Sequence, residues 1–266
     1  MMRSVFLKSV WEQRWSLFWW VGGMCAFNMV TLLFYPMVRD APALNELLEQ
    51  LGPMIEPFMG GIEDMTSPEG YLFSQLFSAV IPFTLIALGI FTGSRAIAGE
   101  EENGTLDLLL SNPVSRYQVV VEKFGSNLIC MTVLAAGTWL GLTVGAGIVS
   151  MDIRYVRLAE TTAGCALLGL TFGTLAFALG CGLGKRNVAA GITAAIVVAL
   201  SILNLLAGLS DRLEALRFAS PFYYNNSAEV LFHGLLPVDM LVLIGLTAIL
   251  LAVSVISFER RDLGTG

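Results

Sequence analysis

The chain has 266 residues, of which 56% are hydrophobic and 14% are charged, and its mean hydropathy is +0.74. Soluble domains carry about 25% charged residues, so this apolar excess excludes a single water-soluble core. The net charge of −6 offers no basic patch for nucleic acid, and the four cysteines all lie in apolar runs without a Cys-x-x-Cys pair, which argues against a disulfide framework or a zinc site.

The apolar residues gather in six runs, each long enough to cross about 30 Å of hydrocarbon as a helix. They predict an all-α polytopic membrane protein with one transmembrane domain over residues 1–266. The expected spans are about 15–38, 71–98, 125–149, 158–183, 187–209 and 237–258, and the loop between the second and third spans covers residues 99–123.

Short amphipathic segments flank these spans. Residues 1–14 are expected to form a helix in the membrane interface, because apolar residues there recur at helical spacing with Trp11 at headgroup depth. Two outer loops, about 39–70 and 210–236, contain similar stretches, which either lie on the membrane or cap a vestibule. Pro82 should kink the second span.

Small and polar residues inside the spans suggest how the helices pack. The third span carries Gly137, Gly141 and Gly145, and the fourth carries Gly169 and Gly173, all at four-residue spacing. Such stripes let helix backbones approach closely, so we expect these two neighbouring spans to pack directly against each other.

Two deep polar residues, Asn28 and Asn204, leave two interpretations open. Either residue could face a substrate path, or it could form a hydrogen bond between helices. No Asp, Glu, Lys or Arg lies near the centre of a span, which argues against an ion-coupled carrier.

The distribution of basic residues predicts the orientation. Ten of the 15 Lys and Arg residues lie on the side of the two termini and five on the other side. The positive-inside rule therefore places both termini in the cytoplasm and the chain in the inner membrane.

The loop between the second and third spans combines an acidic run with a short apolar helix. Gly104 permits a turn after the acidic run, and Pro113 ends the helix that follows. Leu106, Leu109 and Leu110 would share one face of that helix, with no span to cover them. Such a face is typical of a helix that docks into a partner's groove.

This loop resembles the cytoplasmic loop of ABC-2 type transporter permeases, whose pattern is roughly E-E-x-x-G-T-L-E-x-L-L-x-x-P-[VI]-S-R followed by a Lys. The matching residues are Glu101, Glu102, Gly104, Thr105, Leu106, Leu109, Leu110, Pro113, Val114, Ser115, Arg116 and Lys123. Asp107 replaces the usual Glu, and Glu122 stands where Gly is common. The acidic outer loop resembles that of the toxin- and antibiotic-export branch.

The resemblance implies that residues 104–116, with Glu101, Glu102 and Lys123, couple the chain to a separate ATP-binding subunit. It also implies two ATPase subunits and two permeases per transporter, the second permease being a copy or a paralogue. ATP and Mg would bind to the ATPase partner, and the chain itself would hold no cofactor. The implied activity is export of an amphipathic compound, a lipid or a small peptide through the lipid membrane.

The chain's own residues argue against ATP hydrolysis within it. The segment closest to a phosphate-binding G-x-x-x-x-G-K-[ST] loop is Gly184-Lys185-Arg186, which fails because Leu179 and Arg186 occupy required positions. The chain is therefore not expected to be an enzyme.

Two other functions are weighed against export. Relatives of such permeases also use ATP hydrolysis by a partner as a mechanical drive for assembly or maturation of proteins outside the membrane, without a small-molecule path. An intramembrane protease is the third class, but His233 is the only histidine and would lie near the outer surface.

Overall fold

The computed structural model describes residues 5–40, 67–106, 115–208 and 214–261, and every regular element in these ranges is a helix. Six stretches are long and apolar enough to cross a membrane: Phe6–Arg39, Pro68–Ala96, Arg116–Ile148, Tyr155–Leu183, Arg186–Ala207 and Pro237–Arg260. They coincide with the six predicted runs, so the all-α, six-span class is confirmed.

The first stretch comprises α1 (Val5–Leu33) and the short α2 (Tyr35–Arg39), which has a proline in its first turn. The structure differs here from expectation, because α1 continues unbroken from Val5 into the span instead of forming a separate interfacial helix. Its 29 residues extend over about 43 Å, more than the ~30 Å of a bilayer core. The N–H of Phe6 donates to Glu122 Oε2 at 2.9 Å, which joins the start of α1 to a later helix.

The second span is broken, as the proline predicted. It comprises α4 (Pro68–Leu72), the π-helical turn η1 (Phe73–Phe77) and α5 (Val80–Ala96). Pro82 has no N–H to donate to the carbonyl four residues earlier, so the regular ladder fails at Ser78 and Ala79. The hydroxyl of Ser67 accepts from Gly70 N and caps the beginning of this span.

The remaining elements follow in chain order. They are α6 (Ala98–Glu102), α8 (Arg116–Ile148), α9 (Tyr155–Leu183), α10 (Arg186–Gly208), α11 (Glu214–Arg217), α12 (Ser227–His233) and α13 (Pro237–Arg260). α9 ends at Gly184, whose φ of 63° suits a residue without Cβ. α13 begins at a proline, the favoured first residue of a helix.

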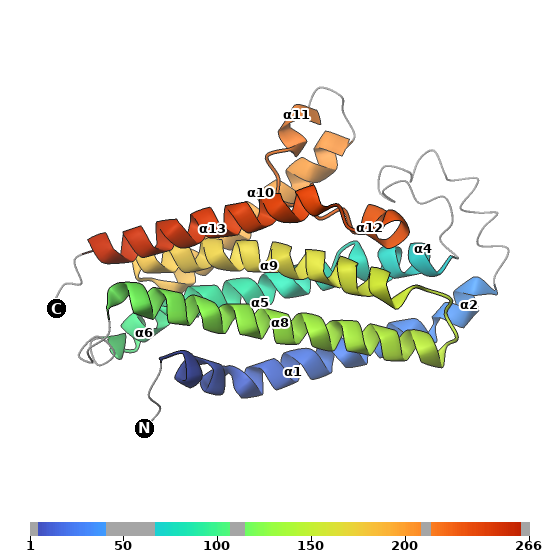
Figure 1. The fold of residues 1–266 in the computed structure, drawn as a ribbon, viewed down its shortest axis with the longest axis horizontal. Helices are drawn as coiled ribbons and strands as arrows, with labels where there is room; N and C mark the ends of the chain where they lie inside the picture. The colour runs from blue at the N-terminus through green and yellow to red at the C-terminus, as the bar shows by residue number, and fades with distance from the viewer. Residues whose placement is uncertain (1–4, 41–66, 107–114, 209–213, 262–266) are drawn as a thin grey trace.

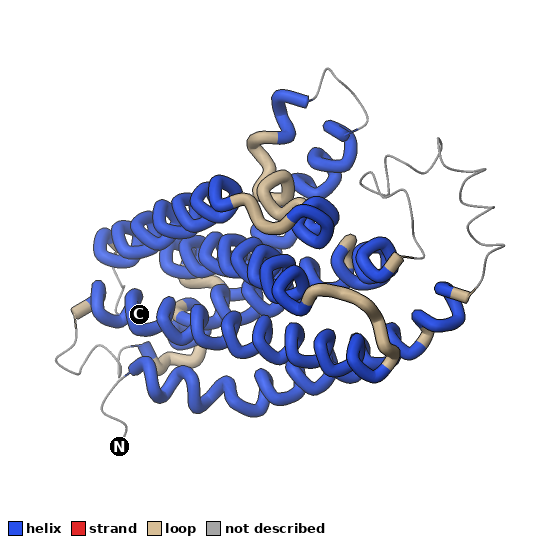
Figure 2. Tube along the Cα trace, turned by 45° about the vertical axis from the view of Figure 1, so that its right-hand side comes forward, coloured by secondary structure: helices blue, strands red, loops and turns tan. Residues whose placement is uncertain are grey.

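The long helices lie roughly parallel or antiparallel in one bundle (Figure 1). α1 begins and α13 ends at the same end of the bundle, where α6 also lies; we call it the α6 end. α2, α4 and α12 lie at the opposite end, the α12 end. Figures 1 and 2 both show the C-terminal part of α10 and α11 standing out from the bundle.

α9 forms the centre of the bundle and contacts α5, α8, α10, α12 and α13. Its most apolar window is 67% buried, whereas that of α10 is 17% buried. In a membrane protein the uncovered apolar surface of α1, α10 and α13 is available to lipid or to another subunit.

Glycines bring α5 and α9 into backbone contact. Gly89 and Gly93 of α5 lie against Gly169 and Gly173 of α9. A methyl group built at Gly173 would lie 2.9 Å from the Cα of Gly89, and one at Gly93 would overlap the carbonyl oxygen of Gly173. Real Cβ atoms do not approach backbone so closely, so these positions require glycine.

The predicted contact between α8 and α9 is present, but the two glycine stripes do not form it. The glycine stripe of α8 faces α1. Its residues Gly137, Gly141 and Gly145 pack against Val21, Cys25 and Leu32. The thiol of Cys25 also donates to the carbonyl of Gly137 at 3.3 Å. α8 and α9 do touch, but their glycine faces point to α1 and α5 respectively, because the rotation of each helix about its axis is not encoded in the spacing alone.

We predict that Gly93→Ala lowers the free energy of unfolding by about 1–3 kcal/mol, because the new methyl meets backbone that cannot turn aside. Gly245→Ala on α13 is the matched control, since nothing lies within 4 Å of its Cβ position. Unfolding in detergent micelles, followed by circular dichroism, measures both. Equal stability of the two variants would contradict the close α5–α9 contact.

Candidate functional site

The residues that resemble a coupling loop emerge at the α6 end, where three successive glutamates lie on the short helix α6. Glu100, Glu101 and Glu102 are about 100° apart around the helix axis. Their side chains therefore point in three directions. Each one binds a different part of the bundle.

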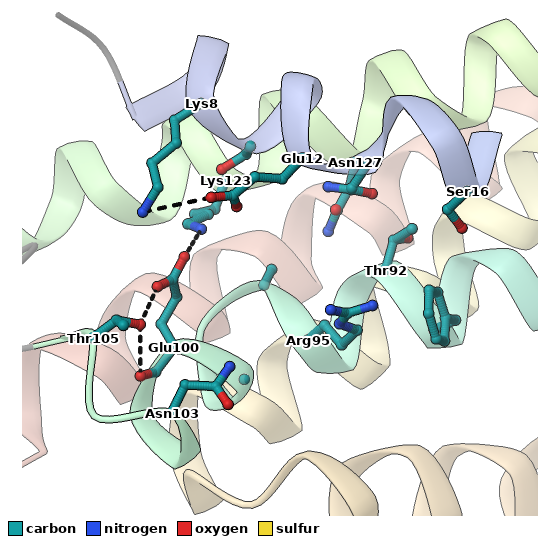
Figure 3. Close-up of a pocket in the computed structure, with 15 residues that line it drawn as sticks. Lys8, Glu12, Ser16, Thr92, Arg95, Glu100, Asn103, Thr105, Lys123 and Asn127 are labelled. Atoms are coloured by element: carbon teal, nitrogen blue, oxygen red, sulfur yellow. Dashed lines mark hydrogen bonds and ion pairs between the residues drawn. The ribbon is translucent and has the colours of Figure 1, made fainter. Parts of the chain in front are cut away.

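Glu100 binds α8. Its Oε1 accepts a hydrogen bond from Lys123 Nζ at 2.6 Å, and its Oε2 accepts one from the hydroxyl of Thr105 (Figure 3). The side chains of Lys123 and Glu100 are only 6% and 13% exposed. Removing one partner from such a buried pair costs about 3–5 kcal/mol.

The carboxylate of Glu100 stays ionised in this setting. Burial by itself raises the pKa of Glu100, but the hydrogen bonds from Lys123 and Thr105 outweigh it and hold the pKa below its ordinary value. The ion pair between α6 and α8 is therefore intact at neutral pH.

Glu101 binds the end of α13. Its two carboxylate oxygens accept from Arg261 Nη1 at 2.8 Å and Nη2 at 2.6 Å, a two-pronged pairing. This pair lies directly over the turn between α9 and α10, because a side chain at Gly184 would overlap the Arg261 guanidinium. Glu101 thus joins α6 to the last helix and to the α9–α10 turn.

Glu102 binds the beginning of α10. Its Oε1 accepts from the backbone N–H of Arg186 at 2.8 Å. The first N–H groups of a helix have no partner within it and carry partial positive charge, so a carboxylate there is favourable. The acidic run therefore contacts α8, α10 and α13 with three consecutive side chains.

Further contacts hold the chain on both sides of the loop, before it at Gly104 and after it at Ser115 and Arg116. Gly104 has a φ of 67°, which confirms the predicted turn after the acidic run. Ser115 Oγ accepts from Gln118 N at 3.1 Å and caps α8. Arg116 Nη1 donates to the carbonyl oxygens of Phe258, Glu259 and Arg261 at 2.8–3.3 Å.

Leu106 departs from the expectation of an exposed docking face. Its side chain is 4% exposed and packs in an apolar cluster with Val120 of α8, Phe177 of α9 and Phe258 of α13. It anchors the chain to the bundle instead of offering itself to a partner. Lys123 is similarly enclosed, so it acts inside the chain.

The other predicted coupling residues, Asp107, Leu109, Leu110 and Pro113, lie outside the described residues. The structure therefore describes the two anchored sides of the loop, up to Leu106 and from Ser115. Sequence reasoning missed Glu100, Arg261 and Phe258. Glu100 stands in the same acidic run as the two matched glutamates, which was the only signal for it.

The two polar residues considered for a substrate path differ in their surroundings. Asn28 of α1 is fully buried, and neither atom of its amide has a hydrogen-bond partner among the described residues. Asn204 of α10 lines a cavity of about 400 Å³ at the α12 end, together with Arg217, Phe83 and Tyr223. Asn204 therefore adjoins a space that a ligand could enter.

A family model described as "ABC-2 family transporter protein" matches residues 29–263. No curated protein matches the chain as a relative. The matched region includes the acidic run, the loop, both glycine stripes and the end of α13, and it covers well over half of the sequence. The chain therefore belongs to the ABC-2 family of transporter proteins.

Proposed function

We propose that this membrane permease subunit of an ABC transporter exports an amphipathic compound, a lipid or a small peptide. A separate ATPase subunit hydrolyses ATP with Mg and docks on the loop around residues 107–114. Two ATPase subunits and two permeases make the working transporter. The α6 end faces the cytoplasm, as the ten basic residues on that side favour.

One observation carries this proposal: the three glutamates of α6 bind α8, α10 and α13 at once. A push on the adjoining loop therefore reaches three membrane-spanning helices through short, charge-assisted contacts. Thr105 and Leu106 connect the loop to the same junction by a hydrogen bond and by apolar packing. This arrangement suits a part that converts motion of a docked subunit into motion of spans.

The cavity at the α12 end supports an exported ligand of amphipathic character. Aromatic side chains, among them Phe83, Phe222 and Tyr223, line it beside the amide of Asn204 and the guanidinium of Arg217. Apolar walls with a few polar groups are typical of small-molecule sites. A purely mechanical transmitter has no need of such a cavity, so we favour export.

The first prediction concerns docking. Leu109→Asp combined with Leu110→Asp should abolish co-purification of the ATPase subunit, because two charges would enter the apolar face that the motif assigns to the partner's groove. Leu216→Asp plus Phe218→Asp is the control, since both side chains are exposed near the opposite end of the bundle. Retention of the ATPase by the loop variant at the control's level would refute the docking proposal.

The second prediction concerns transmission. Glu101→Gln should leave ATPase docking intact but lower transport about two- to fivefold, since a partly exposed ion pair contributes about 0.5–1 kcal/mol. Arg261→Glu combined with Glu101→Arg should recover part of the loss by restoring the pair in reverse. Asp40→Asn removes the exposed Arg39–Asp40 pair and should have no effect. Transport into inverted vesicles, at matched protein levels, is the measurement, and a Glu101→Gln rate equal to wild type would contradict the role of the junction.

The third prediction concerns the second permease. Ala194 and Gly191 form a small-residue face of α10 that the chain leaves uncovered, whereas Ala189 is fully buried. If a second copy packs there, Ala194→Cys should give a disulfide-linked dimer on mild oxidation, and Ala189→Cys should not. Non-reducing electrophoresis of membranes distinguishes the two. A monomer for both variants would show that the identical-copy interface lies elsewhere or that the second permease is a paralogue.

A further inference from the structure

Two cavities lie between α1 and α5. One, of about 380 Å³, is at the α6 end and is polar: α1, α5, α6 and α8 all contribute to its walls. The other, of about 400 Å³, lies farther along the same two helices and is apolar. Neither belongs to the contacts that join α6 to α10 and α13.

The two cavities share one continuous stripe of α1. Lys8, Glu12 and Ser16 line the polar cavity, and Trp19, Gly23 and Phe27 line the apolar one. These residues recur every three or four positions, so they lie on one face of the helix. The antiparallel α5 is divided in the same way. Arg95 and Thr92 line the polar cavity, whereas Thr84 and Val80 line the apolar one.

The polar cavity has a cation without a carboxylate partner. Figure 3 shows Arg95 reaching from α5 into the space below α1, with Lys8 and Lys123 on the opposite side. Lys123 is satisfied by Glu100, and Lys8 faces Glu12 at 3.7 Å in an exposed pair of the kind that contributes little. Arg95 makes no ion pair with any described residue and stacks only on Phe91, at 5.1 Å.

Buried polar atoms in the same cavity also have no partner. Asn127 of α8 and Ser9 of α1 are 7% and 4% exposed, yet Asn127 Oδ1 and Ser9 Oγ form no hydrogen bond within the part of the chain that the structure describes. Both residues line the cavity, and Figure 3 shows Asn127 directed into it. A buried polar atom without a hydrogen bond is destabilising, so these atoms favour a polar ligand. By turning its amide, Asn127 can present either an acceptor or a donor.

The lining of the apolar cavity, farther along α1 and α5, is mostly apolar. Trp19, Trp20, Gly23, Met24 and Phe27 of α1 and Val80 and Thr84 of α5 surround it. Nothing lies within 4 Å of the Cβ position at Gly23, so the glycine leaves room there. A phosphate group alone would use only the polar cavity, whereas a lipid would use both.

We propose that the α1–α5 seam binds one anionic phospholipid from the membrane leaflet on the α6 side. Its phosphate would accept hydrogen bonds from Arg95, Lys8 and the buried polar groups of Ser9 and Asn127. One acyl chain would lie along Trp19, Gly23 and Phe27. Glu12 and Glu100 also face the polar cavity, and their pairing with Lys8 and Lys123 keeps the net charge of the lining at about +1. The bound lipid would bridge α1, α5 and α8 beside the acidic run.

The test uses the full chain, with any subunits that co-purify, in detergent micelles supplied with phosphatidylglycerol or phosphatidylcholine. Native mass spectrometry counts the lipids retained. Arg95→Gln removes the unpaired cation, and Gly23→Leu fills the apolar cavity. Arg14→Gln and Gly22→Leu are the matched controls, because Arg14 is exposed and bonded to Trp11 O, and Gly22 has open space around it outside both cavities. Only variants that unfold at the wild-type temperature are compared.

We expect one phosphatidylglycerol to be retained in preference to phosphatidylcholine. Arg95→Gln should lower retention about tenfold, as the loss of a charge-assisted bond predicts. Gly23→Leu should lower retention about as much, because the leucine side chain would occupy the space of the acyl chain. The two controls should retain lipid as wild type does. A parallel titration with inorganic phosphate distinguishes binding of a lipid headgroup from binding of a free anion. Phosphate binding that depends on Arg95, with lipid retention unchanged in Gly23→Leu, would overturn the lipid in favour of a free anion. Equal retention of the two lipids would overturn the site itself.

Discussion

The architecture depends on the backbone contact between α5 and α9. Gly89 and Gly93 meet Gly169 and Gly173 without any side chain between them, which places α9 at the centre of the bundle. Close approach of this kind replaces the hydrophobic drive that helices lack in lipid. Because α5 is held here, the short helix α6 that follows it emerges at a fixed position. Each of the three glutamates can therefore reach its own partner helix.

The helices of the bundle differ in how closely they pack against one another. Glycine packing joins α5 to α9, and the buried Lys123–Glu100 pair joins α8 to α6. α10 is joined to the centre over fewer contacts and exposes most of its apolar surface. Its first turn, however, is bonded to Glu102. A displacement of α6 would therefore act on a helix that is less buried than the centre of the bundle.

Much of this fold could be predicted from local chemistry. Hydropathy identified the six spans, Pro82 identified the break in the second span, and Gly104 marked a turn. Each of these signals acts within a few residues of its origin. The partners of the glycine stripes were not predictable in the same way, because they depend on how each helix is rotated.

The contacts of α6 and of Leu106 with distant helices were also not predictable from the sequence. Glu101 and Arg261 are 160 residues apart, and nothing near either residue reveals the other. Leu106 looked like part of an exposed face, since its spacing to Leu109 and Leu110 is helical. Its burial depends on Phe258 and Phe177, which come from helices far along the chain. Contacts between residues that are far apart in the chain leave little signal in a single sequence.

The last described residue has a practical consequence for anyone who handles this protein. The carbonyl of Arg261 accepts a hydrogen bond from Arg116, and its guanidinium holds Glu101, so Arg261 lies next to the loop that we propose as the docking site. An affinity tag or fluorescent fusion attached close after Arg261 would be tethered at that surface. It would compete with subunit binding and give a false negative in a pull-down. A label at the α12 end, away from the docking loop, is the better choice.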